Sequence, residues 1–131
     1  DLIICEGGEP GRCAIWNNAV PNMKIQKALH RVRVKEVLSE KFLFHFLFYS
    51  GISGLLEQYF TGTTIKHLTG RELKKIITPL APIEEQQQIV QEIESRLSVA
   101  DKMEESITAS LQQAEALRQS ILKKAFEGKL V

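Results

Sequence analysis

The chain has 131 residues, two cysteines and a formal net charge of +1, and 44% of its residues are hydrophobic. This length allows one compact domain plus one extended element. Two cysteines without zinc-site spacing give neither a disulfide framework nor a metal site, and no apolar run approaches the ~20 residues of a membrane span. We therefore expect a cytoplasmic protein with reduced thiols, no metal and no membrane contact.

Charge is unevenly distributed along the chain. Residues 1–82 contain eleven Lys or Arg against seven Asp or Glu, whereas residues 83–131 contain six against nine. A basic first part joined to an acidic second part fits nucleic acid at one end and protein at the other. The first residue is Asp1 rather than Met, which indicates a fragment or a processed piece.

Residues 1–16 are predicted to form a β-hairpin. Two short apolar runs, 2–5 and 13–16, flank the sequence EGGEPGR, whose glycines and proline are typical of a hairpin loop. The glycines have neither P-loop nor dinucleotide-binding spacing, so a phosphate-binding loop is rejected. Arg12 at the tip is a candidate ligand contact, and a solvated arginine is the alternative.

A turn over residues 17–23 leads into KIQKALHRVRVK, which carries five basic residues in twelve. From His30 onward the pattern alternates and predicts a strand with valines on one face and cations on the other. Such a row of cations can face phosphates, and a solvated strand face is the alternative. The candidate contacts are Lys27, Arg31, Arg33 and Lys35, of which Arg31 and Arg33 could also engage guanine in bidentate fashion.

Residues 39–50, SEKFLFHFLFYS, are apolar almost throughout, and Ser39 is a residue type that caps helix N-termini. We predict a short helix buried on all sides, with a central strand as the alternative. His45 lies among phenylalanines, which favours a core histidine over a catalytic base. Gly51 is expected to end this helix, and helical apolar spacing predicts a second, amphipathic helix over 52–60.

Residues 61–78 return to glycine- and threonine-rich turns that carry cations. Hydroxyls, small residues and cations in loops suit close approach to a nucleic-acid backbone. The candidates are Thr63, Thr64, Lys66, His67 and Arg71. Nothing in the chain supplies a nucleophile with its base or a pair of carboxylates, so we expect no enzyme.

A single long helix is predicted from about Pro82 to Gly128, with glycine as a left-handed stop. The stretch has no internal Pro or Gly, and its apolar residues form one narrow seam of a coiled coil on a rod of roughly 65 Å. The seam residues are Ile93, Leu97, Ala100, Met103, Ile107, Leu111, Ala114, Leu117 and Ile121. The chain has no second helix of this length, so the partner must come from another copy or another protein.

The start of this helix carries a Pro-Leu-x-Pro-x-x-Glu-Gln motif formed by Pro79, Leu80, Pro82, Glu85 and Gln86. This motif, together with the closing ALRQSILKKAFEGKL, resembles the specificity subunit of type I restriction–modification enzymes. The upstream GGEPGRCAIW, HRVRV and GTTIKHLTGRELKK also resemble parts of a target recognition domain, so the likeness covers nearly the whole chain.

The resemblance implies an α+β chain with a partial, mixed α/β target recognition domain over 1–80 and a spacer and dimerisation helix over 81–131. It implies a non-catalytic subunit that reads half of a split site in double-stranded DNA. Its partners would be methyltransferase subunits and, through them, the restriction subunit. No cofactor is assigned to the chain itself. An isolated fragment is expected to form a homodimer through the helix. The alternative is a coiled-coil oligomerisation or adaptor protein whose globular part binds another protein.

Overall fold

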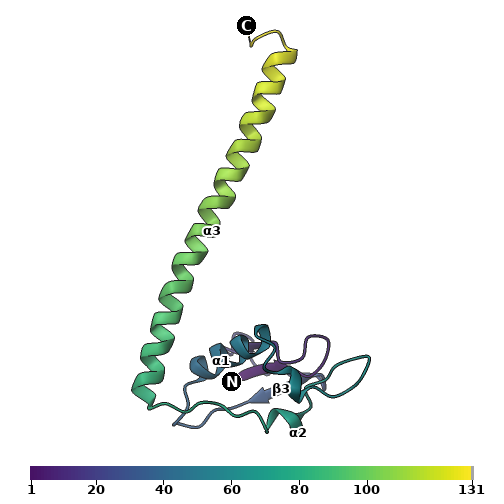
Figure 1. Cartoon of the computed structure of the whole chain (residues 1–131), viewed down its shortest axis with the longest axis vertical. Helices are drawn as coiled ribbons and strands as arrows, with labels where there is room; N and C mark the ends of the chain where they lie inside the picture. Colours follow the sequence, from purple (N-terminus) through teal and green to yellow (C-terminus); the bar gives the residue numbers. More distant parts are fainter. Residues whose placement is uncertain (131) are drawn as a thin grey trace. The chain divides into compact units, whose positions relative to one another are not determined.

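The structure, a computed structural model, describes residues 1–130 and has the α+β class that the sequence predicts. It divides into unit 1, Asp1–Gln91, and unit 2, which begins at Glu92. Figure 1 shows the elements in chain order. They are β1 (Leu2–Cys5), β2 (Cys13–Ile15), β3 (Leu29–Val32), α1 (Glu40–Ile52), the 3-10 helix η1 (Glu57–Tyr59), α2 (Gly70–Leu73) and α3 (Ile83–Phe126).

The three strands form one antiparallel sheet with the order β2–β1–β3. Leu2 on the central strand lies opposite Ile15 on one side and Val32 on the other. Cys5 closes the predicted hairpin with an N–H···O=C bond of 2.8 Å to Arg12. The hairpin is therefore confirmed. The predicted strand after His30 is confirmed in part, because it ends at Val32.

The core of unit 1 lies between one face of the sheet and α1. Because side chains alternate along a strand, Leu2 and Ile4 point to this face and are at most 1% exposed. Leu43 and Leu47 from α1 and Leu68 from a later loop complete the buried cluster. Val32 and Val34 pack against it, as the alternating pattern predicts.

The helix prediction for residues 39–50 is confirmed, and the strand alternative is wrong. Ser39 is the N-cap and its hydroxyl accepts the N–H of Phe42. The helix is not buried on all sides, however, because Phe48 and Tyr49 are more than half exposed. Only one face of α1 packs against the sheet. The opposite face is exposed although it carries apolar side chains.

The glycine that ends α1 is Gly54 rather than Gly51. Gly51 lies inside the helix, whereas Gly54 has φ of +78°, the left-handed conformation that glycine adopts without strain. The predicted amphipathic helix over 52–60 is also wrong. Because the chain turns at Gly54, residues before and after it do not share one helix face. Leu56 is buried, whereas Ile52 is 73% exposed.

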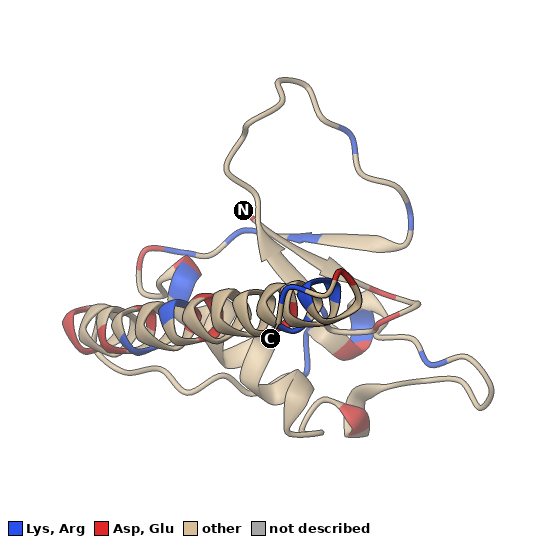
Figure 2. Ribbon diagram, turned by 90° about the horizontal axis from the view of Figure 1, so that it is seen from above, with Lys and Arg blue, Asp and Glu red and all other residues tan. Residues whose placement is uncertain are grey.

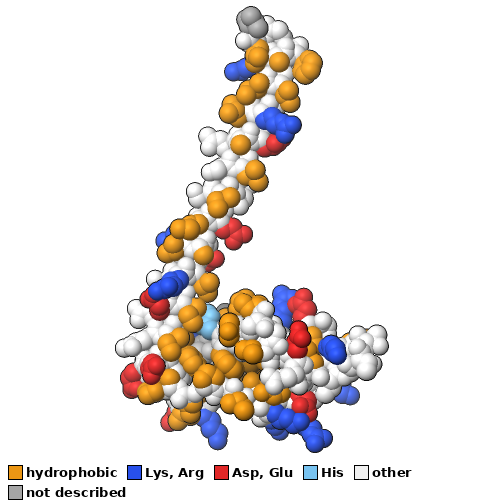
Figure 3. All heavy atoms as spheres, in the orientation of Figure 1, with side chains coloured by type: hydrophobic (Ala, Val, Ile, Leu, Met, Phe, Trp, Pro, Cys, Tyr) orange, Lys and Arg blue, Asp and Glu red, His pale blue; other side chains and the backbone are white. Residues whose placement is uncertain are grey.

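The long helix α3 is confirmed with 44 residues, and Gly128 follows it with φ of +70°. Its first turns belong to unit 1, where Gln86 and Val90 are buried. Every described side chain from Glu94 onward is exposed. Figure 3 shows hydrophobic side chains along the length of this helix. Within residues 1–130, no helix combines the length and the apolarity that crossing a membrane requires.

Candidate functional site

Three loops of unit 1 meet at the backbone of Glu6. The Glu6 N–H donates to the carbonyl of Ala28 at 2.9 Å, and the Glu6 carbonyl accepts the N–H of Leu68 at 2.7 Å. The β1–β2 loop, the end of loop 17–28 and loop 61–67 therefore lie together at one end of the sheet. Figure 1 shows the first of these loops (purple) beside the last (teal).

Loop 61–67 is a small closed hairpin. Thr61 and His67 exchange two backbone hydrogen bonds of 2.8 and 2.9 Å, which hold its base. Gly62 has φ of +91°, and a side chain there would run into the carbonyl of Ile65. The tight turn leaves Thr63, Thr64 and Lys66 exposed at its tip, where hydroxyls and an ammonium can contact phosphate.

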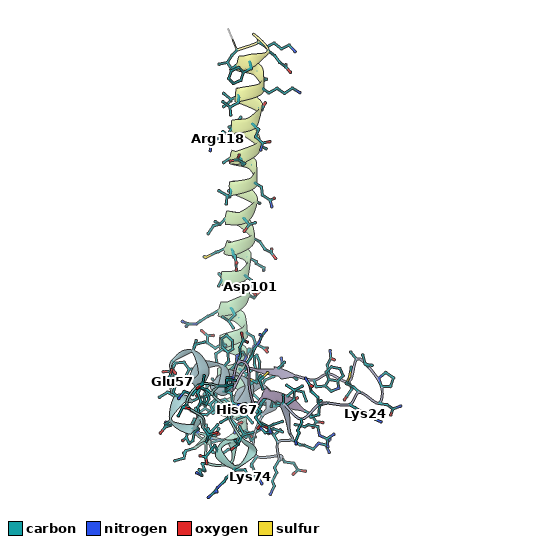
Figure 4. All side chains as sticks on the ribbon, turned by 90° about the vertical axis from the view of Figure 1, so that its right-hand side faces the viewer. Lys24, Glu57, His67, Lys74, Asp101 and Arg118 are labelled. Atoms are coloured by element: carbon teal, nitrogen blue, oxygen red, sulfur yellow. The ribbon has the colours of Figure 1, made fainter. Side chains whose placement is uncertain are left out.

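His67 lies between two of these loops and not at a tip. A Cβ built on Gly7 would come within 2.9 Å of its Nδ1, so the ring lies against the glycine backbone of the β1–β2 loop. The side chain is half-buried, and Figure 4 shows it inside unit 1. This arrangement makes His67 a packing residue for the loops as well as a neighbour of the exposed hydroxyls.

Arg12 projects from the β1–β2 loop and forms an ion pair with Glu9 at 2.5 Å. The hydrogen bond that Arg12 donates to Glu9, together with the negative charge of Glu9, raises the pKa of Arg12. The arginine is 73% exposed. A surface ion pair of this kind contributes little to stability, so a phosphate can displace the carboxylate.

The open face of the sheet carries Arg31, and Arg33 follows just beyond the strand. Arg33 binds the carboxylate of Asp1 through two hydrogen bonds of 2.8 and 3.0 Å. Arg31 lies 3.9 Å from the same carboxylate. Both guanidinium groups are mainly exposed and lie side by side on this carboxylate.

A cavity of about 940 Å³ lies between the open sheet face and the segment that follows β2. Its wall combines apolar side chains with the cations Lys24 and Arg31. Figure 4 shows Lys24 far out on the loop, and Figure 2 shows the Lys and Arg positions around the sheet in blue. Sequence reasoning missed Lys24, although it belongs to the same basic segment as Lys27.

The structure places the sequence-predicted contacts on different elements of unit 1, which gives two groups. The loop group lies at the end where the three loops meet, and the strand group lies at the open face and beyond it. The loop group contains Arg12, Lys27, Thr63, Thr64, Lys66, His67 and the α2 residue Arg71, and the strand group contains Arg31, Arg33 and Lys35.

Two further polar residues hold this region together and were missed as well. His30 Nε2 lies 2.8 Å from the carbonyl of Leu68 and 3.4 Å from Glu6 Oε2, which ties β3 to the loops. Gln86 is fully buried at the start of α3. The Pro-Leu-x-Pro-x-x-Glu-Gln motif marked Gln86 in the sequence, but only the structure shows its contacts.

The thiols and carboxylates offer no cluster for metal binding in the part of the chain that the structure describes. Cys5 and Cys13 are both free and half-buried. Burial, with a smaller effect of Cys5, raises the pKa of Cys13 to about 11. The Cys13 thiol therefore stays protonated at neutral pH, and its Sγ lies 3.9 Å from the carbonyl of Phe44.

The predicted seam of α3 lies on the surface of unit 2. Its large residues from Leu97 to Ile121 are between 46% and 71% exposed, and only Ile93 is half-buried. An apolar stripe of this length on a single helix is typical of a face that another helix covers.

Comparison with known proteins gives a consistent result. Residues 1–113 match the family model for the type I restriction modification DNA specificity domain. The chain is 31% identical over 131 residues to the type I restriction enzyme EcoBI specificity subunit of Escherichia coli, which covers 99% of this chain and 27% of that protein.

A second relative is the EcoKI specificity subunit of Escherichia coli strain K12, with 31% identity over 110 residues, 83% of this chain and 24% of the relative. The EcoDI specificity subunit of Escherichia coli is 28% identical over 97 residues, which are 74% of this chain and 22% of that relative. The chain thus spans about a quarter of the length of these curated relatives. No solved structure matches it significantly.

Proposed function

Because the matching model spans residues 1–113, the chain belongs to the type I restriction–modification DNA specificity domain family, and we propose that it is a non-catalytic DNA-recognition and assembly element. In this proposal, unit 1 reads one half of a split site in double-stranded DNA. The long helix α3 docks methyltransferase subunits and, through them, the restriction subunit. In this proposal, the chain acts in the cytoplasm.

The family match carries this proposal because it covers unit 1 and most of α3 together. The loop group adds physical support. Lys27, Lys66 and Arg71 have no ion-pair partner among residues 1–130, and the tip of loop 61–67 adds two exposed hydroxyls. Contacts of this kind to phosphates give affinity and fix the register of a protein on the duplex.

The strand group supports the reading of bases. Arg31 and Arg33 are exposed guanidinium groups that one carboxylate, that of Asp1, holds close together. An arginine fork can engage the O6 and N7 atoms of guanine in the major groove. The two guanidinium groups are 58% and 70% exposed, so water and a nucleic acid can reach them beside Asp1.

The seam supports the assembly role. Its exposed Leu, Met and Ile side chains need a second helix, and unit 1 has none longer than the 13 residues of α1. In a dimer of this chain, the second helix comes from another copy. In a longer subunit, a second spacer helix would take that place, as the family resemblance implies.

The deciding experiment is coexpression of the chain with the methyltransferase subunit encoded beside it, followed by mapping of methyl transfer on random DNA. We expect co-elution and methylation at a fixed split site. A complex without site selection would restrict the chain to assembly. No complex at all would favour an adaptor whose unit 1 binds another protein, because the exposed seam supports that function equally well.

A further inference from the structure

His30 lies on the face of β3 that is turned toward the core of unit 1. It pairs with Ile4 of the central strand, and cross-strand partners point to the same face of a sheet. Val32 and Val34 continue this face, so the alternating pattern would place an apolar residue at position 30 as well. The histidine side chain is 18% exposed. A polar ring in such a place costs stability unless it is hydrogen-bonded.

The ring of His30 bonds to the backbone of Leu68. Its Nε2 atom lies 2.8 Å from the Leu68 carbonyl oxygen, and because a carbonyl only accepts, Nε2 carries a proton and donates it. The Oε2 atom of Glu6 lies 3.4 Å from the same nitrogen. The Leu68 N–H donates to the Glu6 carbonyl at 2.7 Å. Both backbone polar groups of Leu68 are thus held, one by β3 and one by the β1–β2 loop.

The same ring also packs against the start of α2. A Cβ built on Gly70, the first residue of α2, would lie 3.6 Å from the Cε1 atom of His30, so the ring lies close to the glycine backbone. Thr69 between the two contacts is the N-cap of α2, and its hydroxyl accepts the N–H of Glu72. His30 therefore contacts the chain on both sides of this cap, at Leu68 and at Gly70.

Leu68 separates two sets of candidate phosphate contacts. Loop 61–67 precedes it and presents two threonine hydroxyls and Lys66 at its exposed tip. The short helix α2 follows it and carries the exposed Arg71. Leu68 itself has no exposed surface and belongs to the core cluster. Since both sets are joined to this residue within three positions, a bond that fixes its carbonyl fixes the base of both.

We propose that His30 is a positioning residue that, through the bond from its Nε2 to Leu68, fixes loop 61–67 and α2 on the sheet. In this arrangement Lys66 and Arg71 contact phosphates of the same DNA. The first statement concerns the chain alone, and the second rests on the proposed function. An apolar side chain at position 30 would complete the strand face but leave the Leu68 carbonyl without this hydrogen bond. Glutamine, which has an N–H donor on a side chain of similar length, would restore it.

The first statement is tested by amide hydrogen exchange, followed by nuclear magnetic resonance, in His30→Leu. Leucine fills a similar volume and has no donor. We expect the Leu68 amide to exchange about tenfold faster than in the native chain, because this segment has lost one hydrogen bond. The amide of Leu43 in α1, which donates to the Ser39 carbonyl at 3.0 Å, should exchange at the native rate. An unchanged rate at Leu68 would overturn the proposal.

Two further variants separate the donor from the rest of the ring. His30→Gln should return the exchange rate of the Leu68 amide to near the native value, and equal acceleration in His30→Gln and His30→Leu would overturn the role of Nε2. His45→Leu is the matched control, because it makes the same substitution in α1, where the His45 ring contacts Phe44. It should leave the Leu68 rate unchanged. If His30→Leu does not fold, His30→Val is measured in its place, and failure of both to fold would overturn the positioning role.

The second statement is tested by fluorescence anisotropy of DNA binding over a series of salt concentrations. In His30→Leu we expect Kd to rise about tenfold at fixed salt and the slope of log K against log salt to fall by about 2, one for each of Lys66 and Arg71. His30→Gln and His45→Leu should bind as the native chain does. Unchanged binding and slope in His30→Leu would overturn this statement. If the native chain binds no DNA, this statement fails with the proposed function, while hydrogen exchange still decides the role of His30.

Discussion

The carboxylate of Asp1 joins the two arginines that the sequence singled out. It binds Arg33 in bidentate fashion and lies 3.9 Å from Arg31. Free in solution, the two cations repel each other, and one shared carboxylate keeps them together at the edge of the sheet. A phosphate offers the same kind of oxygen pair as a carboxylate. A DNA phosphate could therefore take the place of the Asp1 carboxylate on these two arginines.

Removing both arginines, with Arg31→Ala and Arg33→Ala, should weaken DNA binding and reduce its salt dependence. If each contacts one phosphate, the slope of log K against log salt falls by about 2. The measurement is fluorescence anisotropy over a series of salt concentrations. The double variant Arg96→Ala, Arg118→Ala on α3 removes the same charge and should leave the slope unchanged. Equal slopes in both double variants would place DNA on a different surface.

Cys13 should react slowly with thiol reagents in the folded chain. With its pKa raised to about 11 from 9.0, the thiolate fraction at pH 8 falls by about 100-fold, and the greater nucleophilicity of the more basic thiolate recovers about tenfold. We expect reaction about tenfold slower than in urea, measured in Cys5→Ser so that one thiol is followed. Equal rates with and without urea would contradict this environment.

The same shift makes stability depend on pH. The unfolded chain loses the Cys13 proton near pH 9, whereas the folded chain keeps it up to about 11. The free energy of unfolding should therefore decrease as pH rises through this window, and this decrease should be smaller in Cys13→Ala.

At the scale of elements, the sequence predicted what local chemistry decides. The hairpin around EGGEPGR, the N-cap at Ser39 and both ends of α3 follow from turn residues, caps and helical spacing. The prediction of a helix over 52–60 was wrong. The chain turns at Gly54, so the apolar residues on its two sides do not lie on one helix face, and the tertiary fold decides which of them are buried. For the site, the candidate cations were visible, but their division into two groups depends on sheet register.

The two glycines near the end of α1 give opposite predictions. Gly51 lies in the helix and a Cβ there meets nothing within 4 Å, so Gly51→Ala should stabilise the chain by about 0.5 kcal/mol. Gly54 has φ of +78°, so Gly54→Ala should destabilise it by about 1 kcal/mol. Urea unfolding followed by circular dichroism measures both. The reverse order would mean that Gly51 ends the helix, as the sequence pattern first indicated.

At the scale of the whole molecule, the two units satisfy their apolar residues in different ways. Unit 1 encloses its own core around Leu2, Ile4 and Leu68. Unit 2 consists of most of one helix, and its described side chains beyond Ile93 are all exposed. In proteins, most of the stability of a helix comes from the packing of its amphipathic face against other elements. Unit 2 therefore presents an apolar face that a partner helix could cover.

We predict that Ile107→Asp abolishes self-association of the chain. The substitution places a charge in the middle of the seam and, in a dimer, does so twice. A cost of about 3 kcal/mol or more corresponds to about a 100-fold rise in Kd. Sedimentation velocity over a range of concentrations measures the change.

Gln112→Asp is the matched control, because residue 112 lies about 140° around the helix from Ile107 and away from the seam. It adds the same charge and should leave the dimer intact. A native chain that sediments as a monomer would contradict the dimer directly. A chain that is monomeric alone but co-elutes with methyltransferase subunits, and loses them in Ile107→Asp, would instead assign the seam to that partner.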